Sequence, residues 1–101
     1  MNKIIRKDHT YRITIEEQVT GGEQGRSVEL EFSDREDLLN VIEKMKTGSG
    51  LETQTATRVG LALRLLGPVL MENRKHPLFV DFMPHFKQFM QNLKSHIKNN
   101  Q

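Results

Sequence analysis

The chain has 101 residues, of which 36% are hydrophobic and 28% charged, and this composition is typical of one small globular domain rather than a disordered segment. It contains no cysteine, which excludes disulfides, thiolate zinc sites and thiol nucleophiles. A formal net charge of +2 is only a weak indication of anionic partners. No secretory signal or membrane-spanning stretch is recognisable, so we expect a cytoplasmic protein of bacterial type.

Residues 1–8 are polar and unpatterned, and we expect a flexible N-terminal arm there. Two later segments alternate between apolar and polar residues with the period of two that predicts β-strands with one dry face. The apolar members are Tyr11, Ile13 and Ile15 in the first segment and Val28, Leu30 and Phe32 in the second. Val19 is in phase with the first segment, so that strand is predicted to reach about residue 19. Residues 20–25 contain three glycines and predict the hairpin loop between the strands.

Ser33 to Glu36 have the pattern of a capping box, in which the Ser33 hydroxyl accepts a hydrogen bond from the Glu36 backbone N–H. The apolar residues that follow recur at helical spacing, which predicts a helix near residues 34–47. Gly48 suits the left-handed conformation that ends a helix, and Ser49 or Thr53 is expected to cap the next one.

Residues 58–71 are almost entirely apolar and predict the centre of the fold, a helix over about residues 52–73. Because its apolar residues surround the helix axis, we expect other elements to bury it on most sides. Gly60 and Gly67 share one face, where they would let another backbone approach closely. Pro68 cannot donate a hydrogen bond to the carbonyl four residues before it, so we expect a kink there or a helix broken in two.

The remaining sequence predicts a turn and a last helix. Residues 73–77 are polar and end in proline, which marks a stop, and residues 78–83 are expected to form a short helical turn. Pro84 is expected to open or interrupt a last helix with one apolar stripe, which gives way to a frayed tail at residues 99–101. The order ββααα indicates an α+β fold, an N-terminal antiparallel β-hairpin followed by three helices, with one layer of helices packed on the hairpin. We expect residues 9–98 to form a single domain.

Four clusters of the sequence are distinctive together: His9 to Thr14, Gly60 to Leu63, Leu66 with Gly67, and Asn73 to Phe79. They resemble an uncharacterised bacterial family, the domain-of-unknown-function family three-eight-six-one. The resemblance covers most of the chain, and it implies a small cytoplasmic α+β protein. It implies no activity, ligand or cofactor.

A hairpin of two strands is marginally stable alone and leaves both of its edges open to pairing. We therefore expect a homodimer, since symmetric homodimers are the commonest soluble oligomers. The two copies would pair either edge to edge through their hairpins or helix to helix through Gly60 and Gly67. The alternative is that a loop or the N-terminal arm covers the edge.

The polar corner after the central helix is the main candidate for an interaction surface. Its candidate residues are Asn73, Arg74, Lys75, His76, Pro77 and Phe79. The leading hypothesis is a non-catalytic, homodimeric interaction or structural module that binds an unknown protein partner through this corner and the neighbouring face of the hairpin. The alternative is a weak nucleic-acid or anion binder that uses the basic run Arg74 to His76, although Glu72 and Asp81 oppose its charge.

Arg64 interrupts the apolar run of the central helix. An unpaired buried arginine is costly, so Arg64 is expected either to pair with a carboxylate or to line a cleft. The candidate carboxylates are those of Asp37, Glu43 and Asp81. A further alternative is therefore a small-molecule-binding domain with a pocket near Arg64, between the hairpin and the helices.

Four histidines suggest a metal or acid–base site only weakly. They are His9, His76, His85 and His96. His85 and His96 would lie about 16 Å apart along one helix, too far to share a metal ion. No metal-ligand spacing, nucleophile elbow, phosphate-binding glycine loop or dinucleotide motif is present. We therefore expect surface histidines and a protein without catalytic residues, metal or cofactor.

Overall fold

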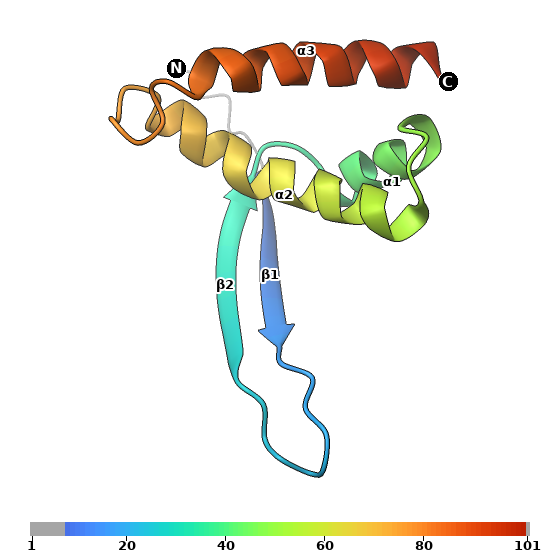
Figure 1. The fold of residues 1–101 in the computed structure, drawn as a ribbon, viewed down its shortest axis with the longest axis vertical. Coiled ribbons are helices and arrows are strands. Elements are labelled where there is room, and N and C mark those ends of the chain that lie inside the picture. Colours follow the sequence, from blue (N-terminus) through green and yellow to red (C-terminus); the bar gives the residue numbers. More distant parts are fainter. Residues whose placement is uncertain (1–7, 101) are drawn as a thin grey trace, which may run out of the picture. The chain divides into compact units, whose positions relative to one another are not determined.

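Two strands and three helices follow one another in the computed structural model, which describes residues 8–100 (Figure 1). This order confirms the predicted α+β class and the succession ββααα. The chain divides into two compact units, Met1–Asp37 with the hairpin and Leu38–Gln101 with the helices. The predicted arm falls almost wholly on residues that lie outside the described part. No helix of the described part is long and apolar enough to cross a membrane.

The hairpin consists of β1 (His9–Glu16) and β2 (Ser27–Asp34), paired antiparallel. The register places Tyr11 opposite Phe32, and the next apolar pairs follow at intervals of two residues. Because opposite residues share a face, all of the apolar side chains lie on one face, as predicted. The other face carries polar and charged pairs, among them Arg12 opposite Glu31. Val19 lies beyond the end of β1, so the prediction of a strand to about residue 19 was wrong.

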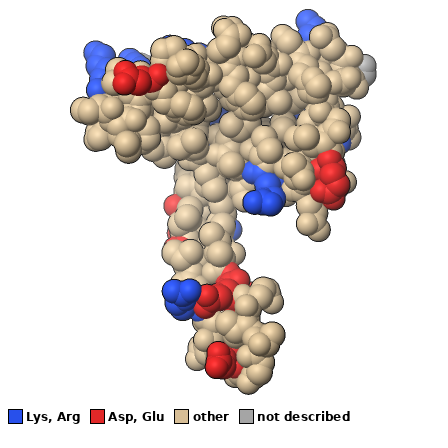
Figure 2. Space-filling model, in the orientation of Figure 1, with Lys and Arg blue, Asp and Glu red and all other residues tan. Residues whose placement is uncertain are grey.

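An ion pair next to the last residues of β1 and β2 closes the base of the hairpin loop. The Glu17 N–H donates to the Arg26 carbonyl at 2.8 Å, and Arg26 Nη2 donates to Glu17 Oε2 at 2.6 Å. The hydrogen bonds from the Arg26 side chain and backbone lower the pKa of Glu17. Beyond this pair, Gly21 and Gly22 adopt φ of 76° and 75°, which favours glycine and turns the chain. Figure 2 shows side chains of both signs meeting near this loop.

The first helix, α1 (Leu38–Gly48), begins later than residue 34 because the predicted capping box does not form. Ser33 remains in β2, and the Asp34 carboxylate instead accepts the Glu36 N–H at 3.0 Å. Gly48 is the last helical residue, and the positive φ of 80° belongs to Gly50. The prediction that Gly48 supplies a left-handed helix end was therefore wrong.

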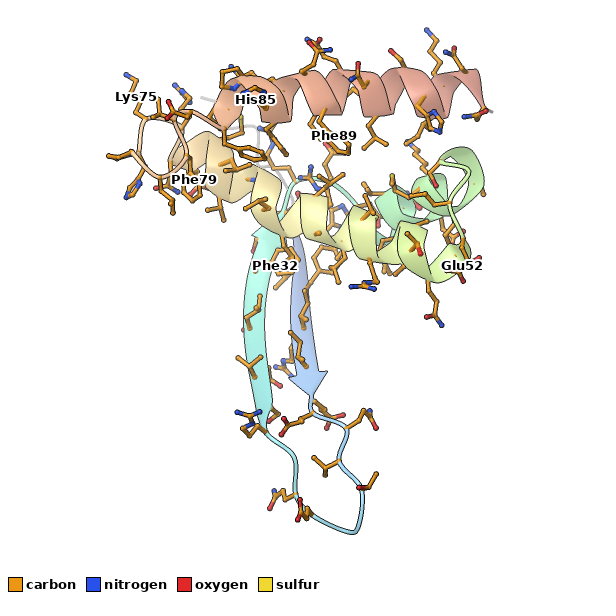
Figure 3. All side chains as sticks on the ribbon, in the orientation of Figure 1. Phe32, Glu52, Lys75, Phe79, His85 and Phe89 are labelled. Atoms are coloured by element: carbon orange, nitrogen blue, oxygen red, sulfur yellow. The ribbon has the colours of Figure 1, made fainter. Side chains whose placement is uncertain are left out.

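The second helix, α2 (Thr53–Glu72), is capped by neither Ser49 nor Thr53. The Glu52 carboxylate accepts the N–H groups of Gln54 and Thr55, each at 3.1 Å (Figure 3). Both hydrogen bonds lower the pKa of Glu52, and the one from the Thr55 N–H has the larger effect. The carboxylate of Glu52 thus caps the helix in place of the serine or threonine hydroxyl that we expected.

Helix α2 runs unbroken through Pro68, so the alternative of a helix divided at this proline was wrong. Its burial is also more one-sided than expected. Leu70 is 1% exposed, whereas Leu66 and Val69 are 41% and 44% exposed. Within the helical unit only α1 and α3 flank this helix, and two neighbours cannot enclose a cylinder whose circumference is apolar.

Three glycines set the close approach of the helices within the helical unit. A Cβ at Gly60 in α2 would meet the Met45 side chain of α1 at 3.2 Å. A Cβ at Gly48 would meet Ile97 Cγ2 of α3 (Met83–Asn99) at 2.8 Å, so that the end of α1 lies against α3. The remaining contact is looser, since a Cβ at Gly67 would lie 3.7 Å from Phe86.

The core of the helical unit lies where α2 turns into α3 (Figure 1). Its buried members are Leu70, Met83 and Phe86, with Leu63, Phe79 and Met90 packed against them. Pro84 occupies the first turn of α3, as predicted, where its missing N–H costs no helical hydrogen bond.

We predict opposite outcomes for alanine at two of the glycines. Gly67→Ala should raise the free energy of unfolding by about 0.5–1 kcal/mol, because alanine favours the helix and its Cβ fits beside Phe86. Gly60→Ala should be about 1 kcal/mol less stable than Gly67→Ala, because its Cβ crowds Met45. Urea unfolding of both variants measures the difference. A Gly60→Ala protein as stable as Gly67→Ala would contradict the close approach of α1 and α2.

We also predict a pH-dependent contribution from the cap of α2. Because the pKa of Glu52 is lowered by folding, its stabilisation is present above the ordinary value of 4.5 and is lost as the pH falls through the lowered value. Glu52→Gln should therefore lower the Tm at pH 7, and the difference from wild type should shrink toward pH 3. Thermal unfolding across this range provides the test, and Glu17 titrates alike in both proteins. A constant difference would contradict the charged cap.

Candidate functional site

The corner between α2 and α3 is held by its own backbone and polar side chains. The Asn73 side chain donates to the Val69 carbonyl at 2.8 Å and completes the end of α2. The His76 N–H donates to the Asn73 carbonyl at 2.9 Å, and the chain then turns helically, with the Val80 N–H on the His76 carbonyl at 3.0 Å. The predicted helical turn over residues 78–83 is thus present. The polar residues of the corner serve first to shape it.

His76 occupies a structural position within this corner. Its Nδ1 accepts the Leu78 N–H at 3.0 Å across Pro77, so this nitrogen carries no proton. Its ring lies 5.8 Å from the ring of Phe79 at an angle of 48°. These contacts use one face and one nitrogen of the imidazole for the turn itself.

The structure separates the apolar residues of the corner into two groups. Phe79 is half-buried and packs on the core, so it anchors the corner (Figure 3). Leu78 is 73% exposed, and Val80 and Phe82 are 47% and 44% exposed. Phe79 but not Leu78 was predicted to belong to the interaction surface, although both lie in one apolar run. Only the direction of the turn distinguishes them.

The charged residues of the corner line a shallow, open depression of about 350 Å³. Its lining residues are Glu72, Asn73, Arg74, Lys75 and His76. The guanidinium of Arg74 donates to the Met71 carbonyl at 3.3 Å, and Lys75 points away from the corner (Figure 3). Because the Glu72 carboxylate lies in the same depression, positive and negative groups are mixed there. This arrangement favours a solvated surface over a phosphate site.

The other predicted positions lie apart from the corner. Gly60 and Gly67 are both buried against side chains of their own chain, as described above. Arg64 is half-buried on α2. Among its candidate partners, Glu43 forms an ion pair with Lys46 at 3.4 Å. The carboxylate that pairs with Arg64 stays a prediction, as does a pocket beside it.

The histidines are not gathered into a site. His96 Nε2 lies 2.7 Å from the Ser49 carbonyl and ties the end of α3 to the segment after α1. His9 stacks on Tyr11 with ring centroids 6.3 Å apart. No group of three or more potential metal ligands occurs within residues 8–100. His96 therefore has a structural contact that helical spacing did not predict.

The hairpin carries a second exposed apolar surface. On its dry face Ile15 is 57% exposed, Val28 54% and Leu30 40%. Tyr11 and Phe32, at the other end of the same face, are half-buried, with ring centroids 5.5 Å apart. The opposite face is polar and charged, and there Arg12 Nη2 lies 2.9 Å from Glu31 Oε2. The exposed apolar side chains of the hairpin thus lie at the loop end of the dry face.

Comparison with known proteins places this fold among proteins of unknown function. The sequence model of a family described as a domain of unknown function with solved structure, DUF3861, matches residues 9–95. The fold is similar to the solved structure of a protein of unknown function (eca1910) from Pectobacterium atrosepticum SCRI1043. The two share 36% sequence identity and a TM-score of 0.79, and the match covers 88% of this chain and 99% of that one. No curated protein matches the chain.

We predict that neighbouring apolar residues of the corner differ sharply in their contribution to stability. Phe79→Ala should lower the free energy of unfolding by about 2–4 kcal/mol, because it removes the ring that packs on the core. Leu78→Ala should change it by less than about 0.5 kcal/mol, because that side chain faces solvent. Chemical unfolding measures both, and equal losses would contradict the division between anchor and exposed tip.

Proposed function

The chain belongs to the DUF3861 family of unknown function, and we propose that it acts as a small, non-catalytic interaction or structural module of the bacterial cytoplasm, working as a homodimer. The use of Asn73 and His76 in shaping the backbone supports a structural rather than a catalytic role for the corner. The origin of the similar structure in a bacterium supports the proposed cellular setting.

The observation that carries the homodimer is the open dry face of the hairpin. Two strands have no second layer of their own, and a two-stranded sheet needs packing against another element for stability. Yet Ile15 and Val28, which face each other in the register, are both more than half exposed. Additional strands stabilise such a sheet, and a second copy of the chain, always present at matched concentration, can add its own strands at an open edge.

The packing of the glycines favours one of the two modes of dimerisation. Pairing of helices through Gly60 and Gly67 requires that face of α2 to be free. Both glycines are instead buried, the first against α1 and the second against α3. The hairpin is therefore the better-supported dimer surface.

The corner supports a second contact, with a partner protein of another kind. Leu78 is 73% exposed, and it follows in sequence the depression that Glu72 and Arg74 line with charges of both signs. An apolar tip with a charged rim is the arrangement of small protein-interaction patches. We therefore retain the surface from Asn73 to Phe79 as the proposed site for that partner, with Leu78 added as its apolar centre.

We predict that sedimentation equilibrium at micromolar concentration gives twice the chain mass of 11.7 kDa. The variant Ile15→Thr keeps a β-forming residue but removes apolar surface beside the open edge of β1. It should raise the dimer Kd about tenfold, because the dimer loses the side-chain contacts of both copies, worth about 1.4 kcal/mol together.

A matched control replaces exposed apolar residues of α2 instead. Leu66→Gln with Val69→Thr removes side chains of similar exposure and should leave the dimer Kd within about twofold of wild type. A chain that remains monomeric at all accessible concentrations would contradict the homodimer. A dimer that is lost in the α2 variant and kept in the hairpin variant would contradict the hairpin as its surface.

A further inference from the structure

The two edges of the hairpin present different groups to any added strand. The Glu17 N–H and Arg26 carbonyl form a ladder hydrogen bond, and their pairing continues the register of β1 and β2 without a bulge. In an antiparallel pair the residues alternate in pointing their N–H and C=O groups toward the partner strand or away from it. Odd-numbered residues of β1 and even-numbered residues of β2 therefore point inward.

The remaining residues direct their backbone groups to the outer edges, and their side chains lie on the charged face. These residues are Thr10, Arg12, Thr14 and Glu16 on β1, and Ser27, Glu29, Glu31 and Ser33 on β2. The described sheet has two strands only, so neither edge has a strand beside it within residues 8–100. Neither strand contains proline or lysine, the residues that commonly prevent edge pairing.

The edge of β2 repels a copy of itself. When two identical strands pair antiparallel about a twofold axis, the numbers of any two residues that lie opposite each other add up to the same value. Any register centred on β2 that keeps the dry face on one side brings Glu29 or Glu31 opposite or beside the same glutamates of the second copy. Like charges directly opposite each other are destabilising.

The edge of β1 is complementary to itself. With Thr14 on the twofold axis, Arg12 lies opposite Glu16 of the second copy, and the pair occurs twice by symmetry. The same register places Ile13 opposite Ile15 of the second copy on the dry face, as a pair without intervening hydrogen bonds, where side chains are closest. Arg12 would then lie between Glu31 of its own chain, at 2.9 Å, and the Glu16 carboxylate across the axis.

We propose, resting on the homodimer proposed above, that two copies join through β1 in this register to form one four-stranded antiparallel sheet in the order β2–β1–β1–β2. The joined sheet has a single apolar face, contributed by both hairpins. Its outer edges are the two β2 strands, whose glutamates oppose the addition of a third hairpin. The assembly therefore closes at two copies.

Cysteine cross-linking tests the edge directly, because the chain has no cysteine of its own. Thr14 and Glu29 face each other in the hairpin, on the same polar face, and differ in the edge that they border. Thr14→Cys should form a disulfide-linked dimer under mild oxidation, since opposed residues at the axis are about 5.5 Å apart between Cα atoms. Glu29→Cys, the matched control, should remain uncross-linked.

The outcomes separate this inference from the homodimer itself. Efficient cross-linking of Glu29→Cys without that of Thr14→Cys would overturn the choice of edge. A dimer by sedimentation that neither cysteine cross-links would overturn edge pairing in this register, and the homodimer would stand. A chain that sediments only as a monomer would overturn both proposals.

A charge reversal tests the register without cysteine chemistry. Glu16→Arg places two arginines opposite each other twice across the axis and should raise the dimer Kd about tenfold or more. Glu23→Arg makes the same charge change in the exposed hairpin loop and should leave the Kd within about twofold. Circular dichroism confirms that both variants are folded. Equal Kd values for the two variants would overturn the Arg12–Glu16 pairing.

Discussion

The structure depends on one constraint: a sheet of two strands cannot bury its own apolar face. Its register places all of the apolar side chains on one face, with Tyr11 and Ile13 among them, and Arg12 on the other. The sorting stabilises the hairpin only where something covers the dry face. At the loop end, where Ile15 is 57% exposed, nothing in the described chain does so. Since a hairpin of two strands is only marginally stable, further strands added at an open edge would stabilise it.

The helical unit satisfies its own packing by a different device. Two close approaches between its helices occur at glycines, at Gly48 against Ile97 and at Gly60 against Met45. Bringing helices together in this way lets a small unit pack its helices closely within 64 residues, from Leu38 to Gln101. With so few helices, the far side of α2 stays exposed at Leu66, and the helix has more apolar surface than its neighbours can bury.

Periodicity alone was sufficient to predict the number, order and type of the elements, because each strand and helix repeats its apolar residues at its own period. The caps were not predictable in this way. Whether Ser33 can begin a helix depends on where β2 ends, and β2 continues through Ser33 because its pairing with β1 continues. The exposed residue of the corner could not be predicted for a related reason. Leu78 and Phe79 are equivalent as sequence, and only the turn at His76 and Pro77 directs one side chain to solvent and the other to the core.

In the proposed dimer, the charges of the hairpin would contribute more to the choice of partner than to stability. Exposed ion pairs such as Arg12–Glu31 are worth at most about 1 kcal/mol, too little to explain why one face is so consistently charged. Their distribution between the strands is informative, because β1 carries both signs on its outer edge and β2 carries only glutamates. Specificity requires that wrong pairings be opposed as well as right ones favoured. In the proposed dimer, a self-complementary edge of β1 beside a self-repelling edge of β2 would meet both conditions with a few side chains, and it would make an otherwise marginal hairpin the centre of a closed assembly.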